Sequence, residues 1–346
     1  MNFIMWILTS RRLILVILLC FLILLLVMVV CACCGTQDIS LSRVFEGPSK
    51  LPGENVDYEI FMGIRLPRVV LAALVGAALA SSGVVLQAIL RNPLADPYIL
   101  GISSGAGLGV IIAFLSGLSF NLLAGSPVAV FAFGGSLFTV WLVWLIGYFA
   151  GRLNVTSLLL AGVVVNAFFS AVIMFLTSIA RSEQLRATVY WLMGSITEKP
   201  ASVLGFSGVG IVGGIVILFI ISNKLNAISV GENEAKSVGV DPVSIKLAAF
   251  SLTAFITAIA VSLSGLIGFV GLVVPHGVRV VLGPDHRTLV PVSAIVGAIF
   301  LVSADTLSRT VFGQEQLPVG VITAMAGGPF FLFLLAKYCK GISWLK

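Results

Sequence analysis

Two arginines, Arg65 and Arg68, flank a proline at the start of a long apolar segment. An arginine within a membrane is costly and usually has a partner. At the end of a membrane-spanning helix, arginines can instead extend toward the lipid headgroups, or they can form an exposed cationic rim that docks an acidic protein. Arg309, near the end of a later apolar segment, would belong to the same rim. The residue types alone leave both uses open.

A tight polar turn follows this apolar segment. Asn92 and Leu94 lie in the motif RNPLADP, and Thr156 and Ser157 begin another apolar segment. The topology given below places all four residues at the inner side of a membrane. Small polar and apolar residues at an inner constriction suit a gate, although ordinary turn and helix N-cap chemistry uses the same residue types.

Serine hydrolysis is the catalytic alternative. The motif GISSG contains Ser103 and Ser104 and resembles the serine turn of intramembrane proteases, with His276 or His286 as the base. Glycine and serine in a membrane helix also serve close helix packing. The sequence has no GxxxxGK[ST] phosphate loop, so we do not expect this chain to hydrolyse ATP itself.

The cysteines give no metal site. Four of them lie in or at the end of the first apolar run, and no histidine or acidic residue stands beside them: Cys20, Cys31, Cys33 and Cys34. We interpret them as small residues of a helix. We therefore expect neither a metal nor a cofactor on this chain.

Composition determines which elements position these residues. Hydrophobic residues make up 59% of the 346 residues and charged residues 10%, against roughly 25% charged in an ordinary globular chain. A spanning helix needs about 20 apolar residues, and a backbone in lipid must satisfy its own hydrogen bonds. The sequence predicts one all-α polytopic membrane domain, residues 1–346, with about ten spans. The net charge of +6 is dispersed, which excludes a nucleic-acid patch.

The predicted spans alternate between the two sides of the membrane. They are about 13–34, 65–90, 98–116, 127–151, 156–180, 203–222, 243–263, a short eighth span of about 269–282, 288–311, and a tenth from residue 318. The first lacks a convincing cleavage site, so we expect it to be retained. Most basic residues then lie on the inner side, which puts both termini in the cytoplasm.

Two further patterns concern packing. Gly101, Gly105 and Gly109 recur at a spacing of four residues, which predicts a flat helix face and a tight bundle. The pairs Ser82-Gly83 and Ser264-Gly265 would lie in stretches that cross in opposite directions. Such an echo is either the trace of an inverted repeat or chance in a glycine-rich chain.

Taken in order, four motifs carry a family resemblance. They are RLPR, GAALASSGVVLQAILRNPLADPYILGISSGAG, SVGENEAKSVGV and SGLIGFVGLVVPHGVR. The stretch from 65 to 329 resembles the FecCD/BtuC-type permease family of iron-siderophore, haem and cobalamin ABC importers. The resemblance implies a type II ABC importer permease fold in the inner membrane. It also implies a homodimer around the translocation path, two cytoplasmic ATPase subunits and an external substrate-binding protein.

The resemblance also implies roles for single residues. It assigns docking of the binding protein to Arg65, Arg68 and Arg309. It assigns the cytoplasmic gate to Asn92, Leu94, Thr156 and Ser157. It assigns the coupling motif, within a coupling loop of about 223–246, to Gly231, Glu232, Ala235 and Gly239. Pro275 and His276 match a family pair to which we give no role.

The runner-up is a secondary transporter driven by an ion gradient. It predicts paired acids within the spans, where Asp305 is the acid that the sequence places in the membrane. The cargo cannot be read from the sequence, because nothing in the spans distinguishes a siderophore from a porphyrin or a corrinoid.

Overall fold

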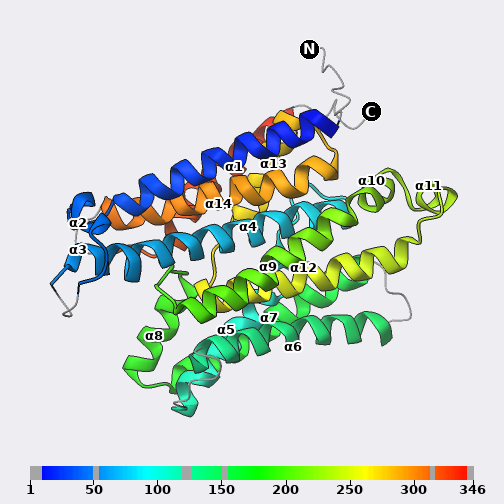
Figure 1. Cartoon of the computed structure of the whole chain (residues 1–346). Helices are drawn as coiled ribbons and strands as arrows, with labels where there is room; N and C mark the ends of the chain where they lie inside the picture. Colours follow the sequence, from blue (N-terminus) through cyan, green and yellow to red (C-terminus); the bar gives the residue numbers. More distant parts are fainter. Residues whose placement is uncertain (1–9, 50–53, 119–125, 150–154, 312–315, 341–346) are drawn as a thin grey trace.

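The computed structural model describes residues 10–49, 54–118, 126–149, 155–311 and 316–340 (Figure 1). These residues form helices and the turns between them, and no strand occurs among them. The all-α prediction is therefore confirmed for the part of the chain that the structure describes.

The helices follow the predicted apolar segments closely. The first half contains α1 (Ser10–Cys33), α2 (Leu41–Phe45), α3 (Val56–Glu59), the π-helical η1 (Ile60–Arg65), α4 (Leu66–Ile89), the 3-10 turn η2 (Pro97–Leu100), α5 (Ile102–Ser116), α6 (Pro127–Phe149), α7 (Val155–Ile179) and α8 (Ser182–Leu192). The second half contains α9 (Ala201–Ile220), α10 (Ser222–Val230), α11 (Glu232–Ser237), α12 (Pro242–Ser264), α13 (Val270–Leu282), α14 (His286–Thr310) and α15 (Val319–Lys340).

Seven helical segments among the described residues are long and apolar enough to cross a membrane. They are Arg11–Cys33, Val56–Ile89, Pro127–Phe149, Ser157–Ile179, Ala201–Ile220, Pro242–Ser264 and His286–Thr310. Three shorter apolar helices, Ile102–Ser116, Val270–Leu282 and Val319–Phe333, accompany them. A count of ten crossings needs these three as well. Ile102–Ser116 and Val270–Leu282 are shorter than the roughly 20 residues of a full crossing, whereas α15 continues to Lys340 and has 22 residues. The count of ten stays a prediction.

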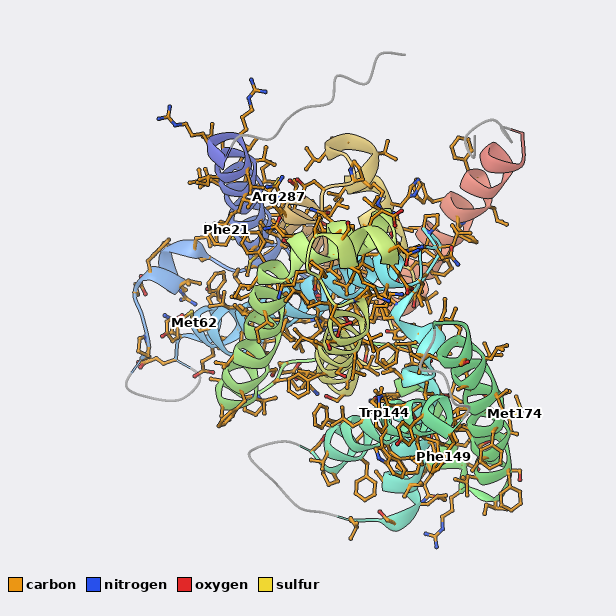
Figure 2. All side chains as sticks on the ribbon, turned by 90° about the vertical axis from the view of Figure 1, so that its right-hand side faces the viewer. Phe21, Met62, Trp144, Phe149, Met174 and Arg287 are labelled. Atoms are coloured by element: carbon orange, nitrogen blue, oxygen red, sulfur yellow. The ribbon has the colours of Figure 1, made fainter. Side chains whose placement is uncertain are left out.

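The helix α4 lies at the centre of the bundle and α1 at its edge (Figure 1). In the most apolar stretch of the segment Val56–Ile89, which contains α4, 83% of the residues are buried. In that of Arg11–Cys33, which lies in α1, 6% are buried. The outer face of α1 and the rims of α6 and α7 expose large apolar side chains, among them Phe21, Phe149 and Met174 (Figure 2). Such a surface suits lipid, whose tails are as apolar as these side chains.

Glycines allow the central helices to touch backbone to backbone. A Cβ atom added to Gly76 of α4 would lie 2.2 Å from the carbonyl oxygen of Gly297 in α14, and one added to Gly83 would lie 1.8 Å from that of Gly271 in α13. No side chain fits into such spaces, so only glycine permits these crossings. Close backbone packing therefore holds α4, α13 and α14 together.

The predicted small-residue face on the third apolar segment is confirmed for Gly105 and Gly109, whereas Gly101 precedes α5 with φ +75°. A Cβ added to Gly105 of α5 would lie 2.5 Å from the carbonyl oxygen of Gly135, and one added to Gly109 would lie 2.0 Å from that of Phe131. Both acceptors belong to α6. The face packs α5 against α6, and Gly105 and Gly109 also line an apolar cavity of about 410 Å³ beside this contact.

The helix α8, Ser182–Leu192, lies between two predicted spans. Its start is capped, because the backbone N–H of Arg181 donates to Oε1 of Gln184 at 3.0 Å.

The two stretches of the sequence echo are placed unequally, since Gly83 lies inside α4 whereas Gly265 ends α12 with φ +68°.

Candidate functional site

The end of the bundle that the sequence predicts to be outer contains the three arginines, and Arg65 binds the end of α1. Its guanidinium donates to the carbonyl oxygens of Cys33 at 2.7 Å, Ala32 at 3.4 Å and Gln37. The last carbonyls of a helix lack partners within it and carry partial negative charge. The side chain therefore joins η1 to α1 from a buried position, with 4% of its surface exposed.

Arg68 and Arg309 share one carboxylate. Arg68 donates to both oxygens of Asp305 at 3.0–3.2 Å, and Nε of Arg309 lies 3.2 Å from Oδ2 of the same residue. A further Arg68 nitrogen donates to Oε1 of Gln316 at 2.9 Å. Asp305 is 1% exposed, so the pair ties α4 to α14 within the buried part of the bundle.

This geometry corrects the expectation of an exposed rim. Arg68 and Arg309 are 7% and 6% exposed, and none of the three arginines extends toward the headgroups. Three guanidinium groups against one carboxylate leave two formal positive charges. They line a cavity of about 170 Å³ together with Gly35, Gln37 and Gln316. We call it the outer cationic cavity after the side that the sequence predicts, and its docking role stays a prediction.

The inner turn after α4 is held by side chains of its own. Oδ1 of Asn92 accepts a hydrogen bond from the backbone N–H of Leu94 at 2.9 Å, and Asn92 itself is exposed. Asp96 caps η2 by accepting from the N–H of Tyr98 at 2.9 Å. Burial raises the pKa of the Asp96 carboxyl to about 6, against the opposing effect of that hydrogen bond.

The other two predicted gate residues begin α7. Ser157 is partly buried and has a polar partner, while the side chain of Thr156 lies outside the described residues. A gate between two copies needs a second chain. The roles of Asn92, Leu94, Thr156 and Ser157 therefore stay predictions.

The predicted coupling loop forms two short helices, α10 and α11, at the end of the bundle that the sequence predicts to be inner (Figure 1). Gly231 separates the two helices. Ala235 of α11 is buried, and Gly239 follows the end of α11 with φ +78°. Glu232 is exposed and pairs with Lys246 of α12 at 2.5 Å. The hydrogen bond and charge of Lys246 hold the pKa of the Glu232 carboxyl below its usual range.

Arg91 joins the inner turn to the coupling segment, which sequence reasoning missed. Its backbone adopts φ +47°, an uncommon conformation for a residue with a side chain. The guanidinium donates to the carbonyl oxygen of Ile228 in α10 at 2.9 Å. A local motif could not reveal this contact, because the two residues lie 137 positions apart.

The described polar contacts do not favour serine hydrolysis. The hydroxyl of Ser104 donates to the carbonyl oxygen of Gly101 at 2.9 Å, one helical turn away. Nδ1 of His286 faces Oδ1 of Asn226 at 2.6 Å. Neither contact is a serine–histidine pair. Among the described residues no group of three His, Cys, Asp or Glu side chains could hold a metal ion.

A helical bundle with an apolar outer surface, buried charge at one end and short surface helices at the other is a polytopic membrane protein. Comparison with known proteins gives the particular family. The model of the FecCD transport family matches residues 21–337, and the chain belongs to that family.

Relatives agree with this assignment. The chain is 43% identical to the cobalamin import system permease BtuC of Halobacterium salinarum, over 79% of this chain and 72% of that protein. It is 42% identical to the hemin transport system permease HmuU of Yersinia pestis, over 81% and 84%. A solved inward-facing structure of a metal-chelate type ABC transporter superposes with a TM-score of 0.78, at 32% identity, over 92% of this chain and 99% of that one. The chain is therefore a multi-pass permease of the inner membrane and of the ABC transporter class.

Proposed function

We propose that this chain is the membrane subunit of an ATP-driven importer for an iron chelate, haem or cobalamin. The family match over residues 21–337 is the observation that carries the proposal. Relatives named for cobalamin and haemin, and a structural neighbour of the metal-chelate type, support this substrate class. Two copies would enclose the path and expose it to each side in turn by alternating access, with both termini in the cytoplasm.

The energy source would be a separate pair of ATPase subunits. The chain lacks a phosphate loop, while α10 and α11 present exposed polar residues such as Glu232 at the inner surface. Cysteines introduced at Glu232 and Gly239 should crosslink to a co-purified ATPase. Cysteine at Ser182, expected on the outer side, is the matched control. Failure of both inner positions to crosslink would refute this contact.

The binding protein would dock at the outer cationic cavity through an acidic side chain. Charge reversal at Arg68 would also leave Asp305 unpaired, so it confounds docking with folding. Gln316→Glu is a cleaner change, because its carboxylate can keep the acceptor for Arg68 while it neutralises one of the two positive charges. We expect weaker association with the binding protein and unchanged stability, whereas Ser182→Glu should leave association unchanged.

The gate between copies can be tested by crosslinking. Cysteines at Asn92 and at Thr156 should form crosslinks between the two copies in at least one nucleotide state. If neither position ever crosslinks, the gate lies elsewhere.

Transport itself separates the proposal from its alternative. Proteoliposomes with the chain, its ATPase and its binding protein should accumulate a ferric chelate, haem or cobalamin only with ATP. Uptake by the chain alone on an ion gradient would favour the secondary transporter. The structure speaks against that reading, because the buried acid Asp305 is already neutralised by Arg68 and Arg309.

A further inference from the structure

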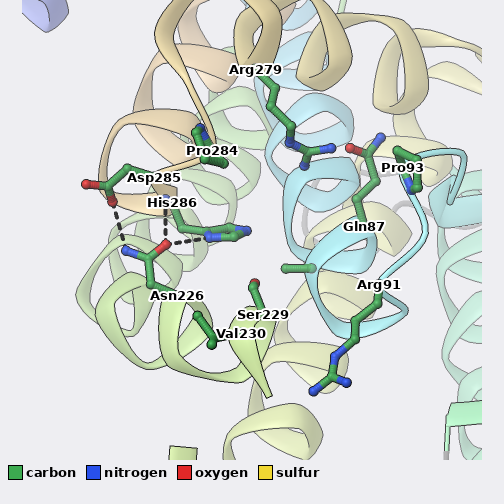
Figure 3. Close-up of a pocket in the computed structure, with 11 residues that line it drawn as sticks. Gln87, Arg91, Pro93, Asn226, Ser229, Val230, Arg279, Pro284, Asp285 and His286 are labelled. Atoms are coloured by element: carbon green, nitrogen blue, oxygen red, sulfur yellow. Dashed lines mark hydrogen bonds between the residues drawn. The ribbon is translucent and has the colours of Figure 1, made fainter. Parts of the chain in front are cut away.

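A second cavity lies at the inner end of the bundle, between α4, α10 and the turn from α13 to α14 (Figure 3). Its volume is about 600 Å³, within the roughly 300–1,000 Å³ typical of ligand pockets. It lies where the spans containing α4 and α14 end, at Ile89 and His286. Because the two apolar spans end there, we expect this inner pocket at the level of the lipid headgroups.

Two buried side chains present unpartnered polar atoms in the wall of the inner pocket. Gln87 is 3% exposed, and neither its amide nitrogen nor its amide oxygen has a hydrogen-bond partner. His286 is 5% exposed, and its Nε2 has no partner. A buried polar group without a partner costs about 1–3 kcal/mol, so native proteins keep few of them. A ligand in the pocket would satisfy these atoms.

The imidazole of His286 is oriented by its neighbours. Nδ2 of Asn226 donates to Oδ1 of Asp285 at 2.8 Å, which leaves Oδ1 of Asn226 as the acceptor for Nδ1–H of His286 at 2.6 Å. The proton of the neutral ring therefore sits on Nδ1, and Nε2 presents its lone pair to the pocket. Nε2 can accept a hydrogen bond from an acidic hydroxyl, or donate one after it takes up that proton.

The charge around the inner pocket is positive. Arg91 and Arg279 both contribute to its lining, and Figure 3 shows Arg279 and Gln87 pointing toward one another across its upper edge. The acid of the wall, Asp285, is already compensated by Arg287, which donates to it at 2.6–3.1 Å. Burial alone would raise the pKa of Asp285, but hydrogen bonds from Arg287 and Asn226 outweigh it and lower that pKa to about 2.

From these contacts we propose that the inner pocket binds an anion that carries a phosphoryl group. Two arginines supply charge-assisted hydrogen bonds, which phosphate oxygens accept well. The amide of Gln87 and Nε2 of His286 match the remaining oxygens and any hydroxyl. The rest of the wall is Ser229, whose hydroxyl donates to the carbonyl oxygen of Leu225, and the apolar residues Ala88, Pro93, Val230 and Pro284. The volume fits an organic group attached to the phosphate, as in the headgroup of an anionic phospholipid.

An occupant at this place would connect three elements that the proposed transport cycle has to move together. Arg91 belongs to the inner turn, Asn226 to α10, and His286 to the start of α14. The bound anion would tie the coupling segment to the transmembrane core. Binding does not depend on the identity of the cargo, so it can be tested without a transport assay.

The experiment uses the purified full chain, with any subunits that co-purify, after delipidation in detergent. Native mass spectrometry would count bound phosphatidylglycerol and phosphatidylcholine. Thermal unfolding in inorganic phosphate, against chloride at equal ionic strength, would test the free anion. The variants are Arg279→Gln and Gln87→Leu. Lys224→Gln is the matched control, because Lys224 is an exposed cation of α10 outside the pocket wall.

We expect one phosphatidylglycerol retained per chain and at least about tenfold weaker binding in Arg279→Gln, as for loss of a hydrogen bond to a charged group. Lys224→Gln should bind like the wild type. Gln87→Leu should fold at least as stably as the wild type, yet bind more weakly. Protection by phosphate without retention of phosphatidylglycerol would identify a soluble anion as the ligand. Equal retention of phosphatidylcholine, or binding that both pocket variants leave intact, would overturn the proposal.

Discussion

Asp305→Asn tests the buried charge cluster directly, because it changes the charge of the side chain and almost nothing of its shape. In the wild type both carboxylate oxygens accept hydrogen bonds from Arg68 at 3.0–3.2 Å, and Arg309 lies 3.2 Å away. Asparagine keeps one acceptor and turns a donor toward the second guanidinium. Two buried cations then face each other without an anion between them.

The size of the effect follows from burial. Removing one partner of a buried pair costs about 3–5 kcal/mol, because the remaining charge is left without compensation. Asparagine retains one hydrogen bond, so we expect a loss of about 3 kcal/mol in the free energy of unfolding. The pair of Glu232 and Lys246 is a control, since the side chain of Glu232 is 52% exposed. Exposed pairs contribute about 0–1 kcal/mol, and Glu232→Gln should cost no more than that.

The assay is a double-mutant cycle in detergent micelles, with reversible unfolding measured for Asp305→Asn, Arg68→Gln and the double variant. Residues in direct contact show coupling of about 0.5–3 kcal/mol. The double variant should therefore lose less than the sum of the single variants by about 1 kcal/mol or more. Additive losses, within about 0.5 kcal/mol, would show that Arg68 and Asp305 are not paired in the folded protein and would refute the buried cluster.

Three further outcomes can be checked by similar means. Gly83→Ala should unfold at a clearly lower temperature, because its Cβ would lie 1.8 Å from the carbonyl oxygen of Gly271, whereas Gly213→Ala meets nothing within 4 Å and should be neutral or stabilising; equal midpoints would contradict the close crossing. Arg91→Gln should lower substrate-stimulated ATP hydrolysis by the assembled complex without preventing assembly, because the contact with Ile228 is lost; unchanged stimulation would exclude this link from coupling. The pKa of Asp96 is raised to about 6, so the contribution of this carboxyl to folding stability is fully present below about pH 4 and is lost as the pH rises through about 6. Asp96→Asn should remove this loss. An identical pH dependence of the unfolding midpoint in wild type and variant would show that the carboxyl does not titrate there.

The amino-acid sequence by itself determined the class and the family. Long apolar runs can satisfy their backbone in lipid only as helices, so the segments that became α4, α7 and α12 could be located to within a few residues. The motifs around Arg65 and Gly231 identified the family because they are contiguous in the sequence. A contiguous pattern is visible without knowledge of the neighbours in space.

Tertiary structure alone decided what the charged residues do. Asp305 comes 237 positions after Arg68, and no local spacing tells which helix will lie beside which. The expected exposed rim became a buried cluster because helix packing brought an acid and the end of α1 to the arginines. Asn226, Asp285 and His286 likewise meet only when α10 folds against the start of α14. Hydropathy specifies that a helix is in the membrane, but every apolar face is acceptable to lipid, so the choice of partner depends on glycine contacts and polar pairs formed across the bundle.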